Sequence, residues 1–133
     1  MRVLLDTHVF LWLHSEPERL GDQLELLEDP TTVRLVSAAV GWEIAIKHGL
    51  GRLALPAPPH QWVPARIVLG AMTPLSVELS HALGVAELPQ HHRDPFDRLL
   101  ISQARHLGVA VVSADPAFRA YDVELLAVAA PPR

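Results

Sequence analysis

Two aspartates, Asp94 and Asp97, lie three residues apart where an apolar helical pattern begins in the stretch HRDPFDRLLISQA. Three further carboxylates, Asp6, Glu43 and Asp115, stand where a predicted strand gives way to a helix or in the first turns of that helix. Carboxylates from distant segments can together hold a divalent cation, which activates water for hydrolysis at phosphorus. The sequence therefore predicts an acidic pocket if the fold brings these segments together.

Each carboxylate also has an ordinary structural explanation. An N-cap at the start of a helix accounts for three of them: Asp6, Asp94 and Asp115. Asp97 falls at the third helical position, where a capping box places an acidic residue. Lys47 follows Glu43 at the i+4 position, which is the spacing of a helix-surface ion pair.

The setting of these side chains is apolar, and it makes a negative charge costly. Asp97 follows Phe96 and precedes Leu99, while Glu43 follows Trp42. Buried carboxylates need a neutralising partner, and the chain has one lysine and no obvious set of buried arginines. A divalent cation would serve, and oxygen ligands alone favour Mg²⁺ or Mn²⁺ over zinc.

Short apolar runs alternate with helical patterns along the chain. The predicted strands are residues 3–5, 33–36, 72–76, 109–112 and 123–128. The predicted helices are residues 7–14, 17–29, 38–48, 60–71, 76–88 and 94–107, with a helical turn at 115–121. This alternation predicts a three-layer α/β/α sandwich with a short parallel sheet of four to five strands. Asp6, Ser113 and Asp115 follow predicted strand ends, so they should face the ligand-binding edge of that sheet.

Length and composition indicate one globular domain over residues 1–133, since half of the residues are hydrophobic and a fifth are charged. The net charge of -4 gives no strongly basic surface for nucleic acid, although a local basic rim is compatible with it. The absence of cysteine excludes disulfides, zinc–thiolate sites and thiol catalysis. No signal-peptide pattern or membrane-length apolar run is present, so we expect a cytoplasmic protein.

Four motifs in order resemble those of the PIN-domain ribonucleases and, within them, the VapC-type toxins of toxin–antitoxin pairs. They are LLDTHVFLW (Leu4–Trp12), SAAVGWEIAIK (Ser37–Lys47) followed by GLGRL, HRDPFDRLLISQA (His92–Ala104) and VVSADPAF (Val111–Phe118). The resemblance covers nearly the whole chain, and its third motif is the most specific. It implies a PIN-like fold and an endoribonuclease that depends on Mg²⁺, for which Mn²⁺ can substitute.

Carried over position by position, the resemblance implies a four-carboxylate metal site that hydrolyses RNA phosphodiester bonds, with Asp6 and Asp97 as the principal ligands. The implied catalytic and metal-binding residues are Asp6, Glu43, Asp97 and Asp115. The residues implied to support this site or to contact the substrate are Thr7, Asp94, Arg98 and Ser113. The implied partners are RNA, a small antitoxin that covers the pocket, and a second copy of the chain. For that homodimer, the proline-rich loop at 52–59 and the helix around Trp62 are the expected contacts.

Three alternatives belong to other function classes. A haloacid-dehalogenase phosphatase needs two aspartates two positions apart at the first strand, where this chain has Asp6-Thr7-His8. A phospho-receiver domain needs adjacent acidic residues there and a lysine late in the chain, whereas the only lysine is Lys47. A catalytically silent PIN module that only binds partners is the third alternative.

The remaining polar and aromatic side chains carry less specific signals. The eight histidines form no ligand pair at helical or strand spacing, so we expect exposed histidines, with His8 and His92 as candidate neighbours of the substrate. Trp12, Trp42 and Trp62 are expected in the core or at an interface. Surface solvation and phosphate contact both remain open for the basic residues that flank the acidic motifs: Lys47, Arg93, Arg98 and Arg119.

Overall fold

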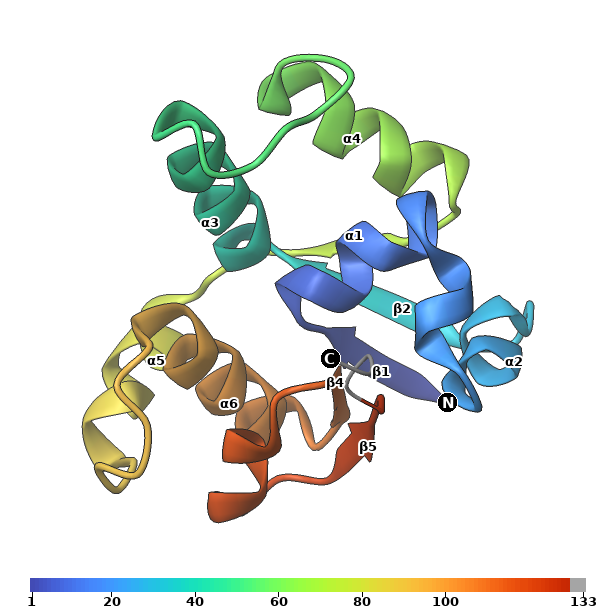
Figure 1. Ribbon diagram of the computed structural model, residues 1–133. Helices are drawn as coiled ribbons and strands as arrows, with labels where there is room; N and C mark the ends of the chain where they lie inside the picture. The colour runs from blue at the N-terminus through green and yellow to red at the C-terminus, as the bar shows by residue number, and fades with distance from the viewer. Residues whose placement is uncertain (130–133) are drawn as a thin grey trace.

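Five short parallel strands form the centre of the structure, a computed structural model that describes residues 1–129 (Figure 1). The strands are β1 (Arg2–Leu5), β2 (Val33–Ser37), β3 (Thr73–Leu75), β4 (Ala110–Ser113) and β5 (Leu125–Ala127). Their order in the sheet is β3-β2-β1-β4-β5, so β1 occupies the middle. β4 is buried along its whole length and β1 along all but its first residue, which is why both appear in the sequence as continuous apolar runs.

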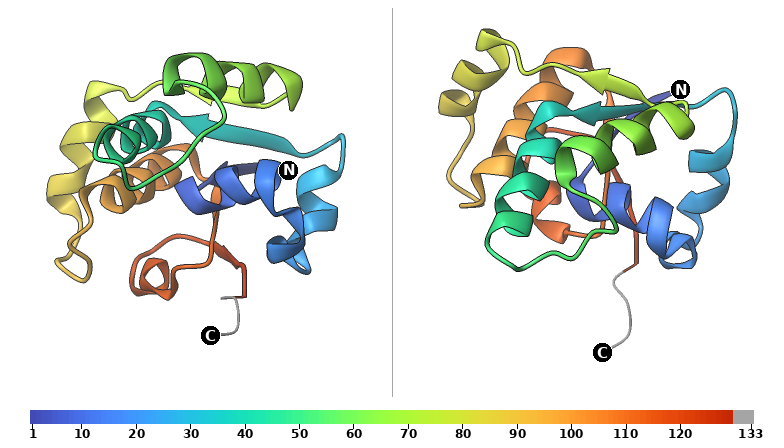
Figure 2. Two further views of the ribbon diagram at one scale, coloured as in Figure 1. Left: turned by 45° about the horizontal axis from the view of Figure 1, so that its top comes forward. Right: turned by 90° about the horizontal axis from the view of Figure 1, so that it is seen from above.

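Helices fill the connections between the strands, and the predicted α/β/α sandwich is confirmed. The α-helices are α1 (Thr7–Ser15), α2 (Gln23–Glu28), α3 (Ala38–Gly49), α4 (Pro59–Leu69), α5 (Leu79–Gly84) and α6 (Pro95–Leu107). The short 3₁₀ helices are η1 (Pro17–Leu20), η2 (Val85–Glu87) and η3 (Pro116–Ala120). The chain steps from β1 to β2 to β3 and then returns across the sheet to β4, so right-handed crossovers put α1–α4 and α5–α6 on opposite faces. In Figures 1 and 2, α1 lies beside α4 and α5 lies beside α6.

Two predicted helices are shorter than expected. The helix predicted over residues 17–29 is divided into η1 and α2 at Gly21, whose φ of 53° lies in the left-handed region that glycine adopts without strain. The helix predicted over residues 76–88 begins only at Leu79, because Glu78 forms its N-terminal capping box with His81, and it gives way to η2 after Gly84. Neither change moves a predicted site residue.

The strands and helices pack around a continuous apolar core. Leu4, Leu5 and Val111 from the central strands, together with Phe10 and Phe118 from the flanking helices, are fully buried. Within residues 1–129, no helix combines the length and the apolar character that crossing a membrane requires.

The strand order creates a reversal point at the carboxyl edge of the sheet. The connection from β1 leads to β2 on one side, whereas β4, on the other side of β1, is reached from β3. Such a reversal opens a crevice beyond the strand ends, and ligands of parallel α/β sheets bind there. Asp6 directly follows β1, and Ser113 is the last residue of β4, so both lie at this crevice.

A pair of glycine substitutions tests the packing of α5 against α6. A Cβ at Gly84 would lie 2.6 Å from Ser102 Oγ and 2.7 Å from His106 Cε1, so we expect Gly84→Ala to lower the free energy of unfolding by roughly 1–3 kcal/mol. Gly41, inside α3, has no neighbour within 4 Å of such a Cβ, so Gly41→Ala should raise it by roughly 0.5–1 kcal/mol. Urea denaturation measures both, and equal effects of the two variants would contradict the close approach of α5 to α6.

Candidate active site

Asp6 lies at the centre of the crevice and is 5% exposed. Its Oδ1 accepts a hydrogen bond of 2.9 Å from the backbone N–H of Val9, so the predicted N-cap of α1 is present. Its Oδ2 accepts a hydrogen bond from the hydroxyl of Ser113 at the end of β4. Burial raises the pKa of Asp6 above its ordinary value and the Glu43 charge adds to the rise, although the two hydrogen bonds oppose it. A negative charge at Asp6 is therefore costly without a cation nearby.

Glu43 is buried on α3, and both of its carboxylate oxygens have partners. Thr7 Oγ1, at the start of α1, donates to Glu43 Oε1 at 2.6 Å. Lys47 Nζ, one turn further along α3, lies 2.5 Å from Glu43 Oε2, so the predicted i+4 ion pair is also present. These two donors hold the Glu43 carboxylate between α1 and α3.

Asp94 and Asp97 have different roles at the start of α6. Asp94 is the N-cap, and its Oδ1 accepts hydrogen bonds from the N–H groups of Phe96, at 2.9 Å, and Asp97, at 3.1 Å. Within residues 1–129 the Asp97 carboxylate makes no bond back to the Asp94 N–H, so the reciprocal half of the predicted capping box is not formed. Its hydrogen-bond partner is instead His92, whose Nε2 lies 2.8 Å from Asp97 Oδ2.

The Asp97 carboxyl resists ionisation because it is mostly enclosed, with 18% of its side chain exposed. Burial raises the pKa of Asp97 to about 6, and the charges of Asp94 and Asp6 contribute to the rise, while the His92 hydrogen bond opposes it.

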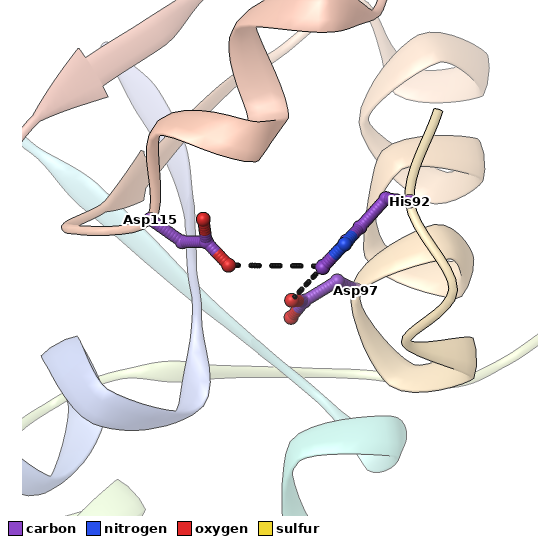
Figure 3. A group of neighbouring side chains, drawn as sticks. All are labelled: His92, Asp97 and Asp115. Atoms are coloured by element: carbon purple, nitrogen blue, oxygen red, sulfur yellow. Dashed lines mark hydrogen bonds and ion pairs between the residues drawn. The ribbon is translucent and has the colours of Figure 1, made fainter. Parts of the chain in front are cut away.

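His92, Asp97 and Asp115, which we call the inner group, form a cluster of three side chains in residues 1–129 that could hold a metal ion (Figure 3). Each offers one ligand atom, and these three atoms lie within 4.8 Å of one another. Asp115 Oδ2 is 3.7 Å from His92 Nε2, while its Oδ1 accepts the N-cap hydrogen bond of 2.9 Å from Ala117. Figure 3 shows the tip of the His92 ring pointing toward both carboxylates, which come from the start of α6 and the turn after β4.

The structure divides the four predicted carboxylates into an inner pair and two neighbours. Asp97 and Asp115 belong to the group with His92, whereas Asp6 and Glu43 lie outside it in the part of the chain that the structure describes. Ser113 joins the two parts, because its hydroxyl donates to Asp6 and accepts from the Asp115 N–H at 3.0 Å. Direct ligation of a metal by Asp6 and Glu43 remains a prediction.

Arg98 does not lie at the surface rim, where solvation or phosphate contact was expected for the flanking basic residues; the expectation that it supports the site stays open. The side chain is buried, so it neither points into solvent nor contacts phosphate at the rim. Its guanidinium donates to the Tyr121 hydroxyl at 3.2 Å and to four backbone carbonyls. Those carbonyls belong to Val85, Leu88, Pro89 and His92. Arg98 therefore fixes the loop before α6 in place, because that loop supplies the acceptors that its buried charge needs.

His92 and Trp42 lie at the site and at the surface, respectively. The histidines were expected to be exposed, with His92 a candidate neighbour of the substrate; its side chain is 22% exposed and belongs to the group with Asp97 and Asp115. Trp42 was expected in the core or at an interface; it is 60% exposed, with its ring edge-on to Phe96 at a centroid distance of 5.1 Å, so it is not in the core and its place at an interface stays a prediction. The only sequence signal for His92 is its place just before the Asp94 cap, where the chain must turn into α6.

A groove of about 370 Å³ extends from the Glu43 side of the crevice. Thr7 and Lys47, which contact the Glu43 carboxylate, also line this groove. Two arginines, Arg19 and Arg52, line it as well. The Arg19 guanidinium lies 5.2 Å from the centre of the Trp12 ring, a cation–π contact. Arg19 is paired with Glu16 at 2.5 Å and Lys47 with Glu43, so Arg52 supplies the groove's remaining positive charge beside the Trp12 ring.

Comparison with known proteins identifies the fold and the family. The family model of the PIN domain matches residues 3–124 of this chain. The chain belongs to the PIN domain family. It is 36% identical over 72 residues to Ribonuclease VapC16 of Mycobacterium tuberculosis, and this match spans about half of each chain, 51% in both cases.

Solved structures of low sequence identity share the PIN fold. A chain of VapBC2 from Rickettsia felis, bound to a promoter DNA fragment, matches with a TM-score of 0.68 at 17% identity, covering 94% of this chain and 97% of that one. A chain of VapBC-1 from nontypeable Haemophilus influenzae matches with a TM-score of 0.64 at 16% identity, covering 96% and 98%. FitAcB from Neisseria gonorrhoeae matches at 0.59 and 21% identity, covering 92% and 95%. The predicted fold and family are therefore confirmed.

The inner group of this PIN domain suits a divalent cation. Bonds of about 2.1 Å to one ion bring ligand atoms to about 3 Å from one another. The His92 Nε2 is already 2.8 Å from Asp97 Oδ2 and 3.7 Å from Asp115 Oδ2, so small side-chain movements would complete such a set. A cation at this place would also offset the cost of ionising Asp97 and Asp6.

Because the pKa of Asp97 is raised, the free energy of unfolding should depend on pH, and Asp97→Asn should remove this dependence. In the chelator-treated protein the folded state holds this proton up to about pH 6, whereas the unfolded chain releases it near the ordinary value of 3.8. Stability relative to Asp97→Asn should therefore be highest below pH 4, fall by roughly 1–3 kcal/mol as the pH rises to 6, and then stay level. Urea denaturation of both proteins across this range measures the difference, and a difference that is flat with pH would contradict the raised pKa.

Proposed function

We propose that this PIN domain is the Mg²⁺-dependent endoribonuclease toxin of a toxin–antitoxin pair, with Mn²⁺ able to substitute. We further propose that it is a single domain over residues 1–133 and acts in the cytoplasm. The observation that carries the proposal is the inner group of Asp97, Asp115 and His92 beside the buried Asp6, at the strand-order reversal of a PIN fold. The partial likeness to Ribonuclease VapC16 supports ribonuclease activity.

The carboxylates act on water and on the phosphodiester through the cation that they hold. Such a cation lowers the pKa of a bound water and offsets negative charge on the phosphate oxygens. Asp6 and Asp97 are the proposed principal ligands, while Asp115 and Glu43 complete the acidic site. A carboxylate of the acidic site that does not bind the cation would accept the proton of the attacking water. By resemblance, water attack leaves a 3′-hydroxyl and a 5′-phosphate.

Four neighbouring residues keep these carboxylates in position. Ser113 holds Asp6 and the Asp115 backbone, and Thr7 holds Glu43. Asp94 fixes the first turn of α6, and Arg98 fixes the loop before it. The proposed roles of these residues are thus to orient the acidic site, and the buried position of Arg98 removes it from direct contact with RNA.

The proposed RNA path follows the basic groove beside Glu43. Arg52 places positive charge along it, and Lys47, which is paired with Glu43, lies beside it, on a chain whose net charge is -4. Phosphate contacts of this kind position a nucleic acid without reading its bases. Arg52 thus supports binding of single-stranded or looped RNA, with the scissile phosphate at the acidic crevice.

The proposed protein partners are a small antitoxin and a second copy of this chain. VapBC and FitAB are named as assemblies in the structures that share this fold, which supports a cognate antitoxin here. Val68 and Leu69, at the end of the helix that carries Trp62, are 77% and 73% exposed, which supports this helix as a homodimer contact. Membership of the PIN family excludes the phosphatase and receiver alternatives. A catalytically silent PIN module is the remaining one.

Cleavage assays test the metal-dependent activity. The purified chain should cut single-stranded RNA in Mg²⁺ or Mn²⁺, lose the activity in excess chelator, and recover it when either ion is restored. Asp97→Asn should lower the rate by about 100-fold or more, because it removes a charged ligand from the inner group. The matched control is Asp22→Asn, on the exposed residue before α2, which should cleave normally. Undiminished cleavage by Asp97→Asn would overturn the assignment, and an inactive wild-type chain would favour the silent module.

Binding assays test the RNA path independently of cleavage. In the Asp97→Asn background, Arg52→Gln should weaken RNA binding by roughly 3- to 10-fold and make the salt dependence shallower by about 0.7 in log–log slope, since one phosphate contact is lost. Arg105→Gln changes an equally exposed arginine on α6 and should leave both quantities unchanged. Fluorescence anisotropy at several salt concentrations measures them, and equal effects of the two variants would place the RNA elsewhere.

A further inference from the structure

The imidazole of His92 lies next to the Asp97 and Asp115 carboxylates, where a further metal ligand could be. We propose that His92 Nε2 binds the divalent cation together with Asp97 and Asp115, so that the centre contains nitrogen as well as oxygen ligands. This inference rests on the proposed function in one respect, namely that the acidic crevice holds a divalent cation. It goes beyond the sequence expectation, which was a set of oxygen ligands alone.

The geometry of the inner group supports direct ligation. His92 Nε2 is 2.8 Å from Asp97 Oδ2 and 3.7 Å from Asp115 Oδ2, and the ring points toward both carboxylates (Figure 3). An ion bound to both aspartates is therefore within reach of Nε2 without a change in the backbone. Neutral imidazole ligates through the nitrogen that carries no proton, so the proton shared by His92 and Asp97 leaves to solvent when the cation binds.

The backbone around His92 is held in place independently of these side-chain contacts. The His92 N–H donates to the Tyr121 hydroxyl at 2.8 Å, and the His92 carbonyl accepts from the buried Arg98 guanidinium at 3.4 Å. Arg98 also donates to the Tyr121 hydroxyl at 3.2 Å and to the Pro89 carbonyl at 2.9 Å. Anchoring of this backbone limits the positions that the His92 ring can reach and so favours a fixed place for Nε2 before the ion arrives.

The competing explanation is that His92 only pairs with Asp97 and stays away from the cation. That pairing would partly neutralise Asp97 in the metal-free protein and would end when the cation arrived. The neighbouring His91 offers a matched comparison, because it is exposed and packs against the Tyr121 ring at a centroid distance of 5.4 Å. Only His92 belongs to the inner group in the part of the chain that the structure describes.

An imidazole ligand has a consequence for the choice of ion. Mg²⁺ prefers oxygen ligands and retains its bound waters, whereas Mn²⁺ accepts an imidazole nitrogen more readily than Mg²⁺ does. We therefore expect the wild-type chain to bind Mn²⁺ more tightly than Mg²⁺. Loss of the His92 imidazole should reduce Mn²⁺ affinity more than Mg²⁺ affinity.

Electron paramagnetic resonance of the full chain with Mn²⁺ tests the ligand directly. Pulsed spectra of the wild-type protein and of His91→Ala should show the nitrogen coupling of a bound imidazole, and ¹⁵N-labelled histidine should change that coupling. His92→Ala should abolish it and weaken Mn²⁺ binding about 10-fold or more, measured from the signal of free Mn²⁺. Competition with Mg²⁺ in the same samples measures the smaller expected loss for that ion.

The outcomes separate the inference from the function on which it rests. Bound Mn²⁺ without nitrogen coupling in the wild-type chain, or with coupling that persists in His92→Ala, overturns the role of His92 and leaves the proposed ribonuclease intact. Failure of the wild-type chain to bind Mn²⁺ at all overturns the proposed metal dependence, and the inference fails with it. The wild-type spectra decide the matter even where His92→Ala does not fold.

Discussion

Negative charge held away from water at the reversal between β1 and β4 is the constraint on which the rest of this structure depends. Asp6 is buried there, and the pKa of Asp97 rises to about 6 because that carboxyl is also largely enclosed. Carboxylates so placed repel one another and lose hydration, so each needs donors from the protein. Ser113 donates a hydrogen bond to Asp6, and His92 is the hydrogen-bond partner of Asp97. The strand order matters because it sets these donors and acceptors, which lie far apart in the sequence, at one edge of the sheet.

Helix capping and site formation use the same side chains, so the two explanations of the carboxylates do not exclude each other. One oxygen of Asp6 caps α1 while the other faces Ser113, and one oxygen of Asp115 caps η3 while the other faces His92. A cap fixes the rotation of the carboxylate and so directs its second oxygen toward the crevice. The same bond therefore orients the site as well as the helix. At α6 the two tasks fall on separate residues: Asp94 caps, and Asp97 faces the crevice.

The sequence predicted the parts of the structure that depend on local pattern. The five strands follow from short apolar runs and the helices from their period, and only breaks set by single residues, such as Gly21 in its left-handed conformation, were missed. The caps were predicted because they need only neighbouring residues. The burial of Arg98 and the close contact of His92 with Asp97 and Asp115 were not, because each depends on how a loop meets a distant segment. No local pattern records which backbone carbonyls will surround a guanidinium.

Burying several negatively charged carboxylates together costs free energy, and any cation that reaches them lowers this cost. Under the proposed function, this links activity to inhibition. A divalent ion would relieve the cost and supply the chemistry, whereas a partner's arginine placed among the carboxylates would relieve it without supplying any chemistry. These cations compete for the same charge, so an antitoxin that brings a guanidinium to Asp97 and Asp6 would displace the ion rather than merely cover the groove. The carboxylates that make the centre costly to fold are then the same ones that allow it to be switched off.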